Sequence, residues 1–310
     1  MVAFVFPGQG SQASGMGKAL AEAYPAARAV FEAADDALGM SLSKLCFEGP
    51  DADLASTEIT QPAILTTSIA ALRALESERP DLSPSWVAGH SLGEWSALVA
   101  AGALRFSDAV RLVKERGRLM QIAVPKGEGA MLAVIGLDAA TVAATCAKVS
   151  GEGQVLEPAN FNSPEQTVVS GHASLVEKAT AAFTEAGAKK VAPLNVSAPF
   201  HCSLMQPAAD GLEAAMGEVE ISAPKVPVLT NVEAAPNTDP AQVKPLLVRQ
   251  VTGAVRWTEL VQHGLSLGET LALEIGPGKV LMGLARRISR DLKVIPVGDP
   301  DGVKKALGAL

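Results

Sequence analysis

The fold prediction rests on the stretch WVAGHSLGEWSALVAA, residues 86–101. Residues 86–89 have the pattern of a short buried strand, and residues 92–101 form an apolar run with the length of a helix. Gly89 and Gly93 allow a sharp turn between the two elements and close packing of one on the other. A strand that runs through a tight turn directly into a helix predicts an α/β fold.

Segments on both sides of this stretch repeat the alternation of strands and helices. The apolar run at 2–6, closed by Pro7 and Gly8, predicts another buried strand, of the kind found in parallel sheets. Pro25 and Pro62 suit the first turns of helices expected at 26–38 and 63–75. After residue 200 we expect helices at 204–216, 242–251 and 279–290 and strands at 226–231 and 270–275. Together these segments predict a large α/β domain with a parallel sheet.

A different order of elements is expected between residues 129 and 196. Strands are predicted at 130–137, 154–161, 166–170 and 189–196, and helices at 139–149 and 175–186. The resulting order, β-α-β-β-α-β, is that of the ferredoxin-like fold. We therefore predict a small ferredoxin-like domain at 128–197, inserted between two parts of the large domain, 1–127 and 198–310.

Composition and charge exclude several classes of protein. With 310 residues, of which 48% are hydrophobic, the chain can bury a normal core. Its net charge of −7 argues against binding nucleic acid, which requires a basic surface. Residues 96–104, the longest nearly uncharged apolar stretch, are too few to cross a membrane, and the N-terminus lacks the basic region of a secretory signal. Cys46, Cys146 and Cys202 lack the spacing of zinc or redox sites and predict a reducing, cytoplasmic environment.

Ser91 is the candidate nucleophile. It is the central residue of a GxSxG motif, residues 89–93, between a predicted strand and a predicted helix, as in the nucleophile elbow of the α/β hydrolases. The large domain is therefore predicted to be α/β-hydrolase-like. The helix N-terminus would present the backbone N–H of Leu92 to an oxyanion. The alternative is a glycine-rich turn in which Ser91 only caps the helix.

A serine nucleophile needs a base, and histidine suits this role near neutral pH. His90 is expected on the opposite side of the turn from Ser91, while His172 and His263 are expected to be exposed. His201 follows an apolar run and precedes a helix, which makes it the best candidate, with a buried structural histidine as the alternative. No acid is singled out as a third member, because those available lie in patterns of solvated charge: Asp108, Glu115, Asp138 and Glu165.

Two further features are candidates for binding a ligand. Arg116 is followed by Gly117 in a helical pattern, so its side chain could face a cleft, with a solvated helix face as the alternative. Residues 8–13, GQGSQA, match the glycine pattern of a dinucleotide site, but such a site requires a second strand ending in an acid, and residues 28–38 have a helical pattern. We therefore reject a dinucleotide and keep this loop, with Gln9 at its tip, as a source of backbone N–H groups.

Taken together, eight segments resemble the malonyl-CoA:acyl carrier protein transacylases, acyltransferases that load malonyl units for fatty acid and polyketide synthesis. They occur in the family's order across nearly the whole chain. The segments are FPGQGSQ (6–12), TQPA (60–63), GHSLGE (89–94), the RG pair at 116, NFNSP (160–164), PFHC around 201, LVRQ ending at 250 and EIGPGKVL (274–281).

The resemblance implies a role for each candidate residue. Ser91 would be the acylated nucleophile, and His201 would be the general base and then the acid, oriented by the main-chain carbonyl of Gln250 rather than by a carboxylate. Backbone N–H groups of Gln9 and Leu92 would form the oxyanion hole. Arg116 would pair bidentately with the free carboxylate of malonate. The other residues placed in substrate binding are His90, Asn160, Asn162, Phe200 and Gln250, with the Phe200 ring selecting malonyl over methylmalonyl.

The implied reaction consists of two acyl transfers through one intermediate. Ser91 would take the malonyl group from malonyl-CoA and pass it to the phosphopantetheine thiol of acyl carrier protein, with ping-pong kinetics. No metal and no other cofactor is expected. The acidic chain would meet the carrier through a local basic patch formed by Lys189, Lys190, Lys279, Arg286, Arg287 and Arg290.

Two alternatives use the same fold differently. A serine esterase or lipase would transfer the acyl group to water, and the survival of the acyl-enzyme without a thiol acceptor discriminates against it. A non-catalytic docking module would not need Ser91 and His201 together. A free-standing enzyme is expected rather than part of a synthase, because the first strand begins at Val2.

Overall fold

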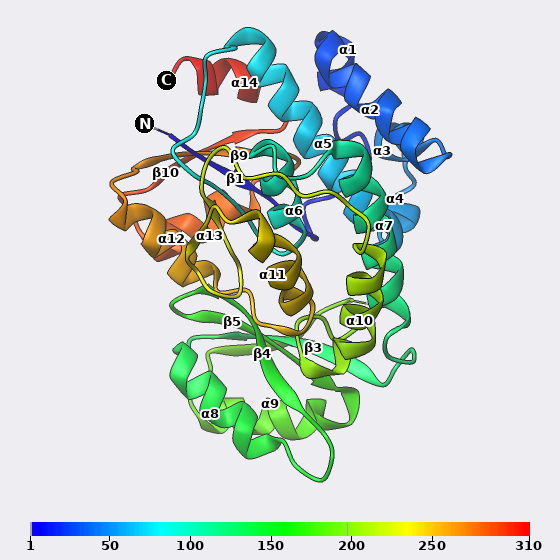
Figure 1. Ribbon diagram of the computed structural model, residues 1–310. Helices are drawn as coiled ribbons and strands as arrows, with labels where there is room; N and C mark the ends of the chain where they lie inside the picture. Colours follow the sequence, from blue (N-terminus) through cyan, green and yellow to red (C-terminus); the bar gives the residue numbers. More distant parts are fainter. Residues whose placement is uncertain (1, 197) are drawn as a thin grey trace.

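The chain folds around two sheets, and the computed structural model describes residues 2–196 and 198–310 (Figure 1). The larger sheet has the strand order β10-β9-β1-β2-β7-β8. Its neighbouring strands are parallel, except for β8, which is antiparallel to β7. The strands are β1 (Ala3–Phe6), β2 (Val87–Gly89), β7 (Val228–Leu229), β8 (Pro236–Asn237), β9 (Leu271–Ile275) and β10 (Lys293–Val297).

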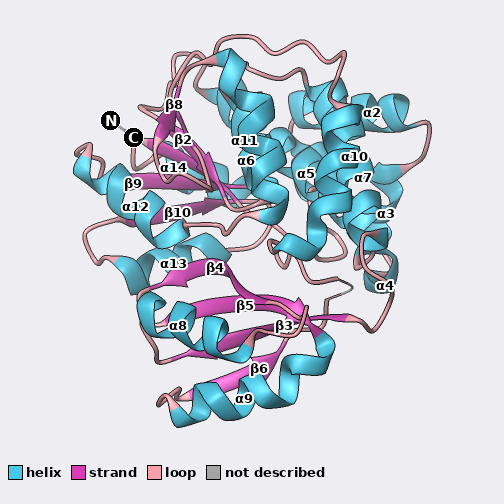
Figure 2. Ribbon diagram, turned by 60° about the horizontal axis from the view of Figure 1, so that its bottom comes forward, coloured by secondary structure: helices cyan, strands magenta, loops and turns pink. Residues whose placement is uncertain are grey.

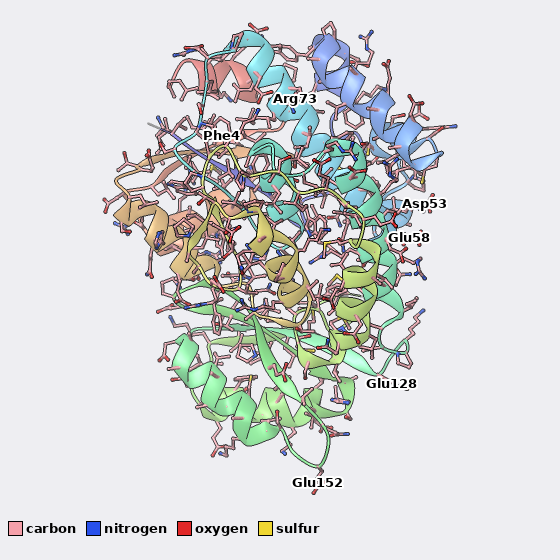
Figure 3. All side chains as sticks on the ribbon, in the orientation of Figure 1. Phe4, Asp53, Glu58, Arg73, Glu128 and Glu152 are labelled. Carbon is pink, nitrogen blue, oxygen red and sulfur yellow. The ribbon has the colours of Figure 1, made fainter. Side chains whose placement is uncertain are left out.

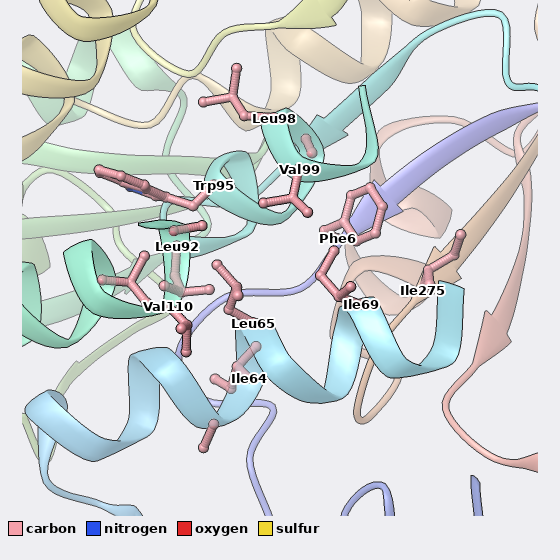
Figure 4. Packing of buried hydrophobic residues seen from close by; sticks show 14 of the residues in the cluster. Phe6, Ile64, Leu65, Ile69, Leu92, Trp95, Leu98, Val99, Val110 and Ile275 are labelled. Carbon is pink, nitrogen blue, oxygen red and sulfur yellow. The ribbon is translucent and has the colours of Figure 1, made fainter. Parts of the chain in front are cut away.

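Helices cover both faces of this sheet, which is why β1 and β2 are buried throughout. On one face, β1 and α6 pack on α5 and α7, and Figure 4 shows Phe6, Leu65, Leu92 and Trp95 among the side chains of this apolar cluster. A second apolar cluster on the other face includes Trp257. The helices of the large unit are α1 (Lys18–Ala23), α2 (Pro25–Leu38), α3 (Leu42–Glu48), α4 (Asp51–Leu54), α5 (Thr57–Glu78), α6 (Leu92–Ala100), α7 (Phe106–Ile122), α10 (Gln206–Ala215), α11 (Pro240–Thr252), α12 (Trp257–Ser266), α13 (Val280–Ile288) and α14 (Pro300–Leu307).

The second sheet is antiparallel and has the strand order β4-β5-β3-β6 (Figure 2). It consists of β3 (Gly129–Ile135), β4 (Leu156–Ser163), β5 (Gln166–His172) and β6 (Lys190–Pro193). Helices α8 (Ala139–Val149) and α9 (Val176–Glu185) cover one face and enclose a separate apolar core. The element order and strand order are those of a ferredoxin-like unit, as the sequence predicts. Two of the predicted domain limits, Met1 and Ser197, lie outside the described residues.

The strand at the edge of the small sheet, β4, also contacts the large unit. Asn160 forms a parallel bridge with Val255, in which Val255 N–H donates to Ala159 O and Phe161 N–H donates to Val255 O. Helices α12 and α13 pack against the same strand. In Figure 3, Arg73 and Glu152 mark opposite ends of the molecule, so this junction lies between them. Among the described residues, no helix is long and apolar enough to cross a membrane.

Some predicted boundaries are wrong. The helix predicted at 63–75 begins at Thr57, and Pro62 lies inside it rather than in its first turn. The start of α5 packs closely on α7, because a Cβ on Gly117 would lie 2.5 Å from the Thr57 oxygen. The strand predicted at 226–231 is only Val228–Leu229, and the helix predicted from 204 begins as a 3-10 turn, η2 (Ser203–Met205).

The elements that the sequence did not predict are mostly short. Runs of four to eight residues carry little periodicity from which to identify them. The edge strand β10 contains Pro296, which argues against a strand in sequence but is tolerated at the edge of a sheet. The missed elements are α1, α3, α4, β8, α12, β10 and α14.

Candidate active site

The turn after β2 holds Ser91 in a conformation that few residues other than glycine adopt. Its φ is 50° and its ψ is −105°, and it stands immediately before the first residue of α6. Both flanking glycines are required by space: a Cβ on Gly89 would lie 1.9 Å from the Gly93 carbonyl carbon, and one on Gly93 would lie 2.0 Å from Phe6 O. Such backbone strain is found where the surrounding structure holds a functional residue in place.

His201 faces Ser91 across the site, although 110 positions separate them in sequence. The distance from Ser91 Oγ to His201 Nε2 is 2.8 Å. On the other side of the ring, His201 Nδ1 lies 2.8 Å from Gln250 O and 3.2 Å from Gly253 O. Because carbonyls only accept hydrogen bonds, Nδ1 carries the proton and donates it, which leaves Nε2 free to accept the serine proton.

Two features keep His201 neutral. Burial, and after it the nearby positive charge of Arg116, lower the pKa of His201 from 6.5 to about 3. The backbone of His201 is held in place as well, with a φ of 61° in the left-handed region. The carbonyls that orient it belong to the last turn of α11 and the residue after it, where carbonyls lack partners within the helix. No carboxylate is therefore needed to hold the ring.

Arg116 enters the site from α7 and is fully enclosed. Its Nη1 donates to Gln61 Oε1 at 2.7 Å, and its Nη2 donates to Gln250 Oε1 at 2.9 Å and to Ser91 Oγ at 3.2 Å. Its Nε has no partner among the described residues, and none of their carboxylates forms a salt bridge with it. Burial lowers the pKa of Arg116 to about 10, so it stays charged at neutral pH. A buried cation without a direct counter-ion is a binding site for an anionic group.

The side chain of Gln250 fills the space behind this arginine. Its Nε2 donates to Glu94 Oε2 at 2.7 Å and to Ser91 O at 3.1 Å. Glu94 also accepts from Asn231 N–H at 3.0 Å, and Asn231 Oδ1 accepts from Ser91 N–H at 2.7 Å. Burial raises the pKa of Glu94 to about 7. This network fixes the nucleophile and the arginine to the same group of buried amides.

His90 lies beside the nucleophile but does not bond to it. Its Nε2 is 2.8 Å from Asn162 Oδ1 of β4, and its ring packs at 5.6 Å from that of Trp257. Although we expected it on the opposite side of the turn, His90 reaches the cavity that Ser91 faces, because β4 lies directly over the turn. His172 and His263 are half-buried rather than exposed: Val155 N–H donates to His172 Nδ1, and His263 Nε2 is enclosed.

The cavity in front of Ser91 has a volume of about 130 Å3. Sequence reasoning missed its floor and apolar walls: Gln61, Met120, Met131, Leu194 and Val196. Gln61 lies within the TQPA segment, which could have suggested it, whereas nothing in the sequence marks the methionines. Asn162 and Gln250 lie behind the lining. The predicted residues that line the cavity are Gln9, His90, Ser91, Leu92, Arg116, Asn160, Phe200 and His201.

Backbone N–H groups at the mouth of the turn can stabilise negative charge. Leu92 begins α6, so its N–H has no acceptor within the helix, and Leu92 lines the cavity. The loop that carries Gln9 touches the turn directly, because a Cβ on Gly8 would lie 2.3 Å from His90 O. Among the described residues, no group of three histidine, cysteine or acidic side chains is arranged to hold a metal. The site thus combines a serine, a neutral histidine, a buried arginine and helix-terminal N–H groups.

Comparison with known proteins shows the family to which the chain belongs. The family model for the acyl transferase domain matches residues 3–298. The malonyl CoA-acyl carrier protein transacylase of Salmonella typhimurium is 48% identical over 305 residues, 98% of each chain. Of solved structures, the transacylase of that name from Coxiella burnetii superposes with a TM-score of 0.97 at 42% identity, covering 100% of this chain and 97% of the other. A malonyl-transacylase in complex with a type II polyketide synthase acyl carrier protein gives 0.96 at 45% identity, with coverage of 100% and 99%.

Proposed function

The chain belongs to the acyl transferase domain family, and from this premise we propose that it transfers a malonyl group from malonyl-CoA to the phosphopantetheine thiol of an acyl carrier protein. We infer the malonyl substrate from Arg116. Its buried guanidinium places Nη2 3.2 Å from Ser91 Oγ, and its Nε has no hydrogen-bond partner among the described residues. A planar guanidinium binds a carboxylate through two parallel hydrogen bonds. Malonyl carries such a carboxylate two carbons from its thioester, and acetyl does not.

The first half-reaction uses the Ser91 and His201 pair. His201 Nε2 takes the hydroxyl proton as Ser91 Oγ attacks the thioester carbonyl, and a tetrahedral oxyanion forms. The backbone N–H groups of Gln9 and Leu92 form the oxyanion hole. The C–S bond then breaks, and the coenzyme A sulfur takes the proton from His201. The product is a malonyl ester of Ser91.

The second half-reaction repeats these steps in reverse with a different thiol. His201 takes the proton of the carrier's phosphopantetheine thiol, whose sulfur attacks the ester, and Ser91 leaves and regains the proton. Ping-pong kinetics follow because coenzyme A departs before the carrier binds. No metal or redox group takes part in these proton transfers.

The other predicted site residues, which line the cavity or lie directly behind its lining, serve the substrate. We assign His90, Asn160 and Asn162 to the groove that holds the pantetheine arm, and Phe200 to the wall beside the carbon between the two malonyl carbonyls. Gln250 acts through its carbonyl on His201 and through its side chain on Arg116.

The organisation and location that we propose complete this assignment. We divide the chain into a large domain, 1–127 and 198–310, and a small domain, 128–197. The free, buried thiols of Cys46, Cys146 and Cys202 support a cytoplasmic location. The pathway served is fatty acid or polyketide synthesis.

Intact-protein mass spectrometry tests the proposal. Malonyl-CoA alone should add one malonyl group to the protein, and holo acyl carrier protein should remove it. Ser91→Ala should fold normally and take up none, because helix α6 does not depend on the hydroxyl. A malonyl adduct on Ser91→Ala would move the nucleophile elsewhere, and rapid hydrolysis of the adduct without a thiol would favour an esterase.

A further inference from the structure

Strand β4 of the small sheet contacts each of the three segments that carry the reacting groups. At its start, Glu157 binds Ser203, two residues after His201. In its middle, the backbone of 159–161 is bridged to Val255, two residues after the Gly253 carbonyl that faces His201 Nδ1. Near its end, Asn162 Oδ1 binds His90, the residue before Ser91.

Irregularities in β4 make these contacts possible. The pairing of β4 with β5 shifts between Pro158 and Asn160 and again between Phe161 and Ser163. Each shift changes which side chains point toward the large unit, as β-bulges commonly do beside functional sites. A regular strand could not present Glu157, the 159–161 backbone and Asn162 to three separate segments of the large unit.

From this arrangement we propose that β4 aligns the base with the nucleophile, and that Glu157 is a positioning residue for His201. The inference rests on the proposed function only in taking Ser91 and His201 as the reacting pair. Glu157 touches no reacting atom. It acts through Ser203 on the segment that contains His201, two residues earlier in the chain.

The geometry of the Glu157 contact explains why the loop needs it. Glu157 Oε2 accepts the Ser203 backbone N–H at 2.7 Å, and Oε1 accepts its hydroxyl at 2.8 Å. Ser203 opens the 3-10 turn η2, which leads into α10. The Glu157 carboxylate, on strand β4, therefore caps the start of this helical segment. His201 holds a φ of 61°, a conformation that costs free energy and persists only when its neighbours fix it.

The chain supplies a matched control for this contact. Asp138 accepts the backbone N–H of Thr141 at 2.8 Å and its hydroxyl at 3.0 Å. The chemistry is the same, a carboxylate that binds the N–H and O–H of one residue at the start of a helix. Helix α8, however, covers the core of the small sheet and is followed by β4, not by a segment that carries a reacting group. Asp138→Ala therefore measures the loss of a cap alone.

Two substitutions of Glu157 separate positioning from stability. Glu157→Ala removes both hydrogen bonds, and kcat should fall about tenfold with the KM for malonyl-CoA little changed, since a lost cap of this kind is worth about that factor. Glu157→Gln should recover most of kcat, because its amide oxygen accepts the N–H and its NH2 group donates to the Ser203 hydroxyl. Asp138→Ala should lower the midpoint of thermal unfolding while leaving kcat unchanged.

A second readout is independent of the malonyl substrate. Ser91 should react with phenylmethanesulfonyl fluoride at a rate set by His201, and this rate should fall in Glu157→Ala in parallel with kcat. Equal kcat values for Glu157→Ala and Asp138→Ala, or a sulfonylation rate unaffected by Glu157→Ala, would overturn the inference. Failure of the unaltered protein to accept malonyl would instead overturn the proposed function, and the sulfonylation comparison would still decide the role of Glu157.

Discussion

In the function that we propose, the choice of substrate depends on Arg116. Three of its hydrogen bonds go to Gln61, Gln250 and Ser91, and its Nε is left for a ligand. A carboxylate that enters this pocket gains a charged partner, whereas an acetyl group leaves the buried guanidinium without a counter-ion. Strong discrimination against acetyl-CoA follows from that difference.

Arg116→Ala should therefore reverse the preference. Malonyl transfer should fall by about two orders of magnitude, the scale of a lost charge-assisted bidentate pair, while acetyl transfer should hold or rise. Arg116→Lys should recover only part, because an ammonium is a point charge without the planar fork. The measurement is the ratio of malonyl to acetyl kcat/KM in the three proteins. An unchanged ratio in Arg116→Ala would mean that another residue recognises the carboxylate.

The lowered pKa of His201 gives a prediction about pH. Burial first and the Arg116 charge second lower it to about 3, so the neutral base persists in acid, and the carbonyls of Gln250 and Gly253 only partly oppose this. Glu94 is the neighbouring group whose pKa, raised by burial to about 7, can titrate instead. In Glu94→Gln, single-turnover acylation should thus be flat from about pH 5 to about pH 8. A loss of rate in that variant below pH 6.5, the ordinary value for histidine, would contradict a neutral His201.

The same shift predicts the direction of stability with pH. Below pH 6.5 the unfolded chain binds a proton on this histidine, whereas the folded chain binds it only near pH 3. The contribution of His201 to the free energy of unfolding is therefore present above pH 6.5 and is lost as the pH falls toward 3.

At the scale of elements, the turn between β2 and α6 depends on glycine for contact distance rather than for flexibility. Gly93 brings α6 within reach of the end of β1, where an added Cβ would lie 2.0 Å from Phe6 O. Helix and strand would have to separate to admit a methyl group. This would disturb Leu92 and Trp95, which face the apolar core from the first turn of α6 (Figure 4).

Gly93→Ala should for this reason lower the free energy of unfolding by about 3 kcal/mol, the upper end of the usual range for overpacked positions. Gly283, inside the exposed face of α13, has no atom within 4 Å of an added Cβ and serves as the control. Gly283→Ala should raise stability by up to about 1 kcal/mol through helix propensity. Urea unfolding of the two variants gives the comparison, and similar values for both would show that the close contact at Gly93 is not limiting.

At the scale of the whole molecule, the sequence predicted the pieces better than their contacts. The elbow at Ser91 has a local signature, since glycine spacing, strand and helix occur within 16 residues. The β-α-β-β-α-β order of the small sheet was readable because its helices and strands are long enough to be periodic. The short strand β7 and the proline-containing edge strand β10 have no such signal.

The features of the site that the sequence did not predict are contacts between segments far apart in the chain. The family resemblance predicted that the Gln250 carbonyl orients His201, and the structure places it 2.8 Å from His201 Nδ1. The second carbonyl, that of Gly253, was not predicted, because a hydrogen bond to a backbone group depends on backbone geometry and not on the side chain at that position. The Glu157 contact with Ser203 joins strand β4 of the small sheet to the 3-10 turn η2, and no sequence pattern near either residue predicts it. Residue types can be identified from a chain, but hydrogen bonds to backbone groups of another element require its fold.

The net charge of this chain is −7, so the basic patch predicted to meet the carrier protein has to be local. The six predicted basic residues are all exposed, but they are not equivalent. Lys189 is paired with Glu165, and Arg287 donates to Gln166. Arg286, in α13, and Arg290, two residues beyond its end, have no partner among the described residues. Unpaired cations lose little on meeting a carrier carboxylate, since no existing ion pair has to break.

The double variant Arg286→Glu/Arg290→Glu should accordingly raise the KM for carrier protein steeply at low salt, with transfer to free pantetheine unchanged. Lys189→Glu should have a smaller effect, because that charge is already shared with Glu165. Lys18→Glu on α1, which Figure 1 shows at the end of the molecule away from the small sheet, controls for net charge alone. If the double variant impairs transfer to free pantetheine as much as transfer to the carrier, α13 does not dock the carrier. The same conclusion follows if Lys18→Glu raises the KM for carrier protein as much as the double variant does.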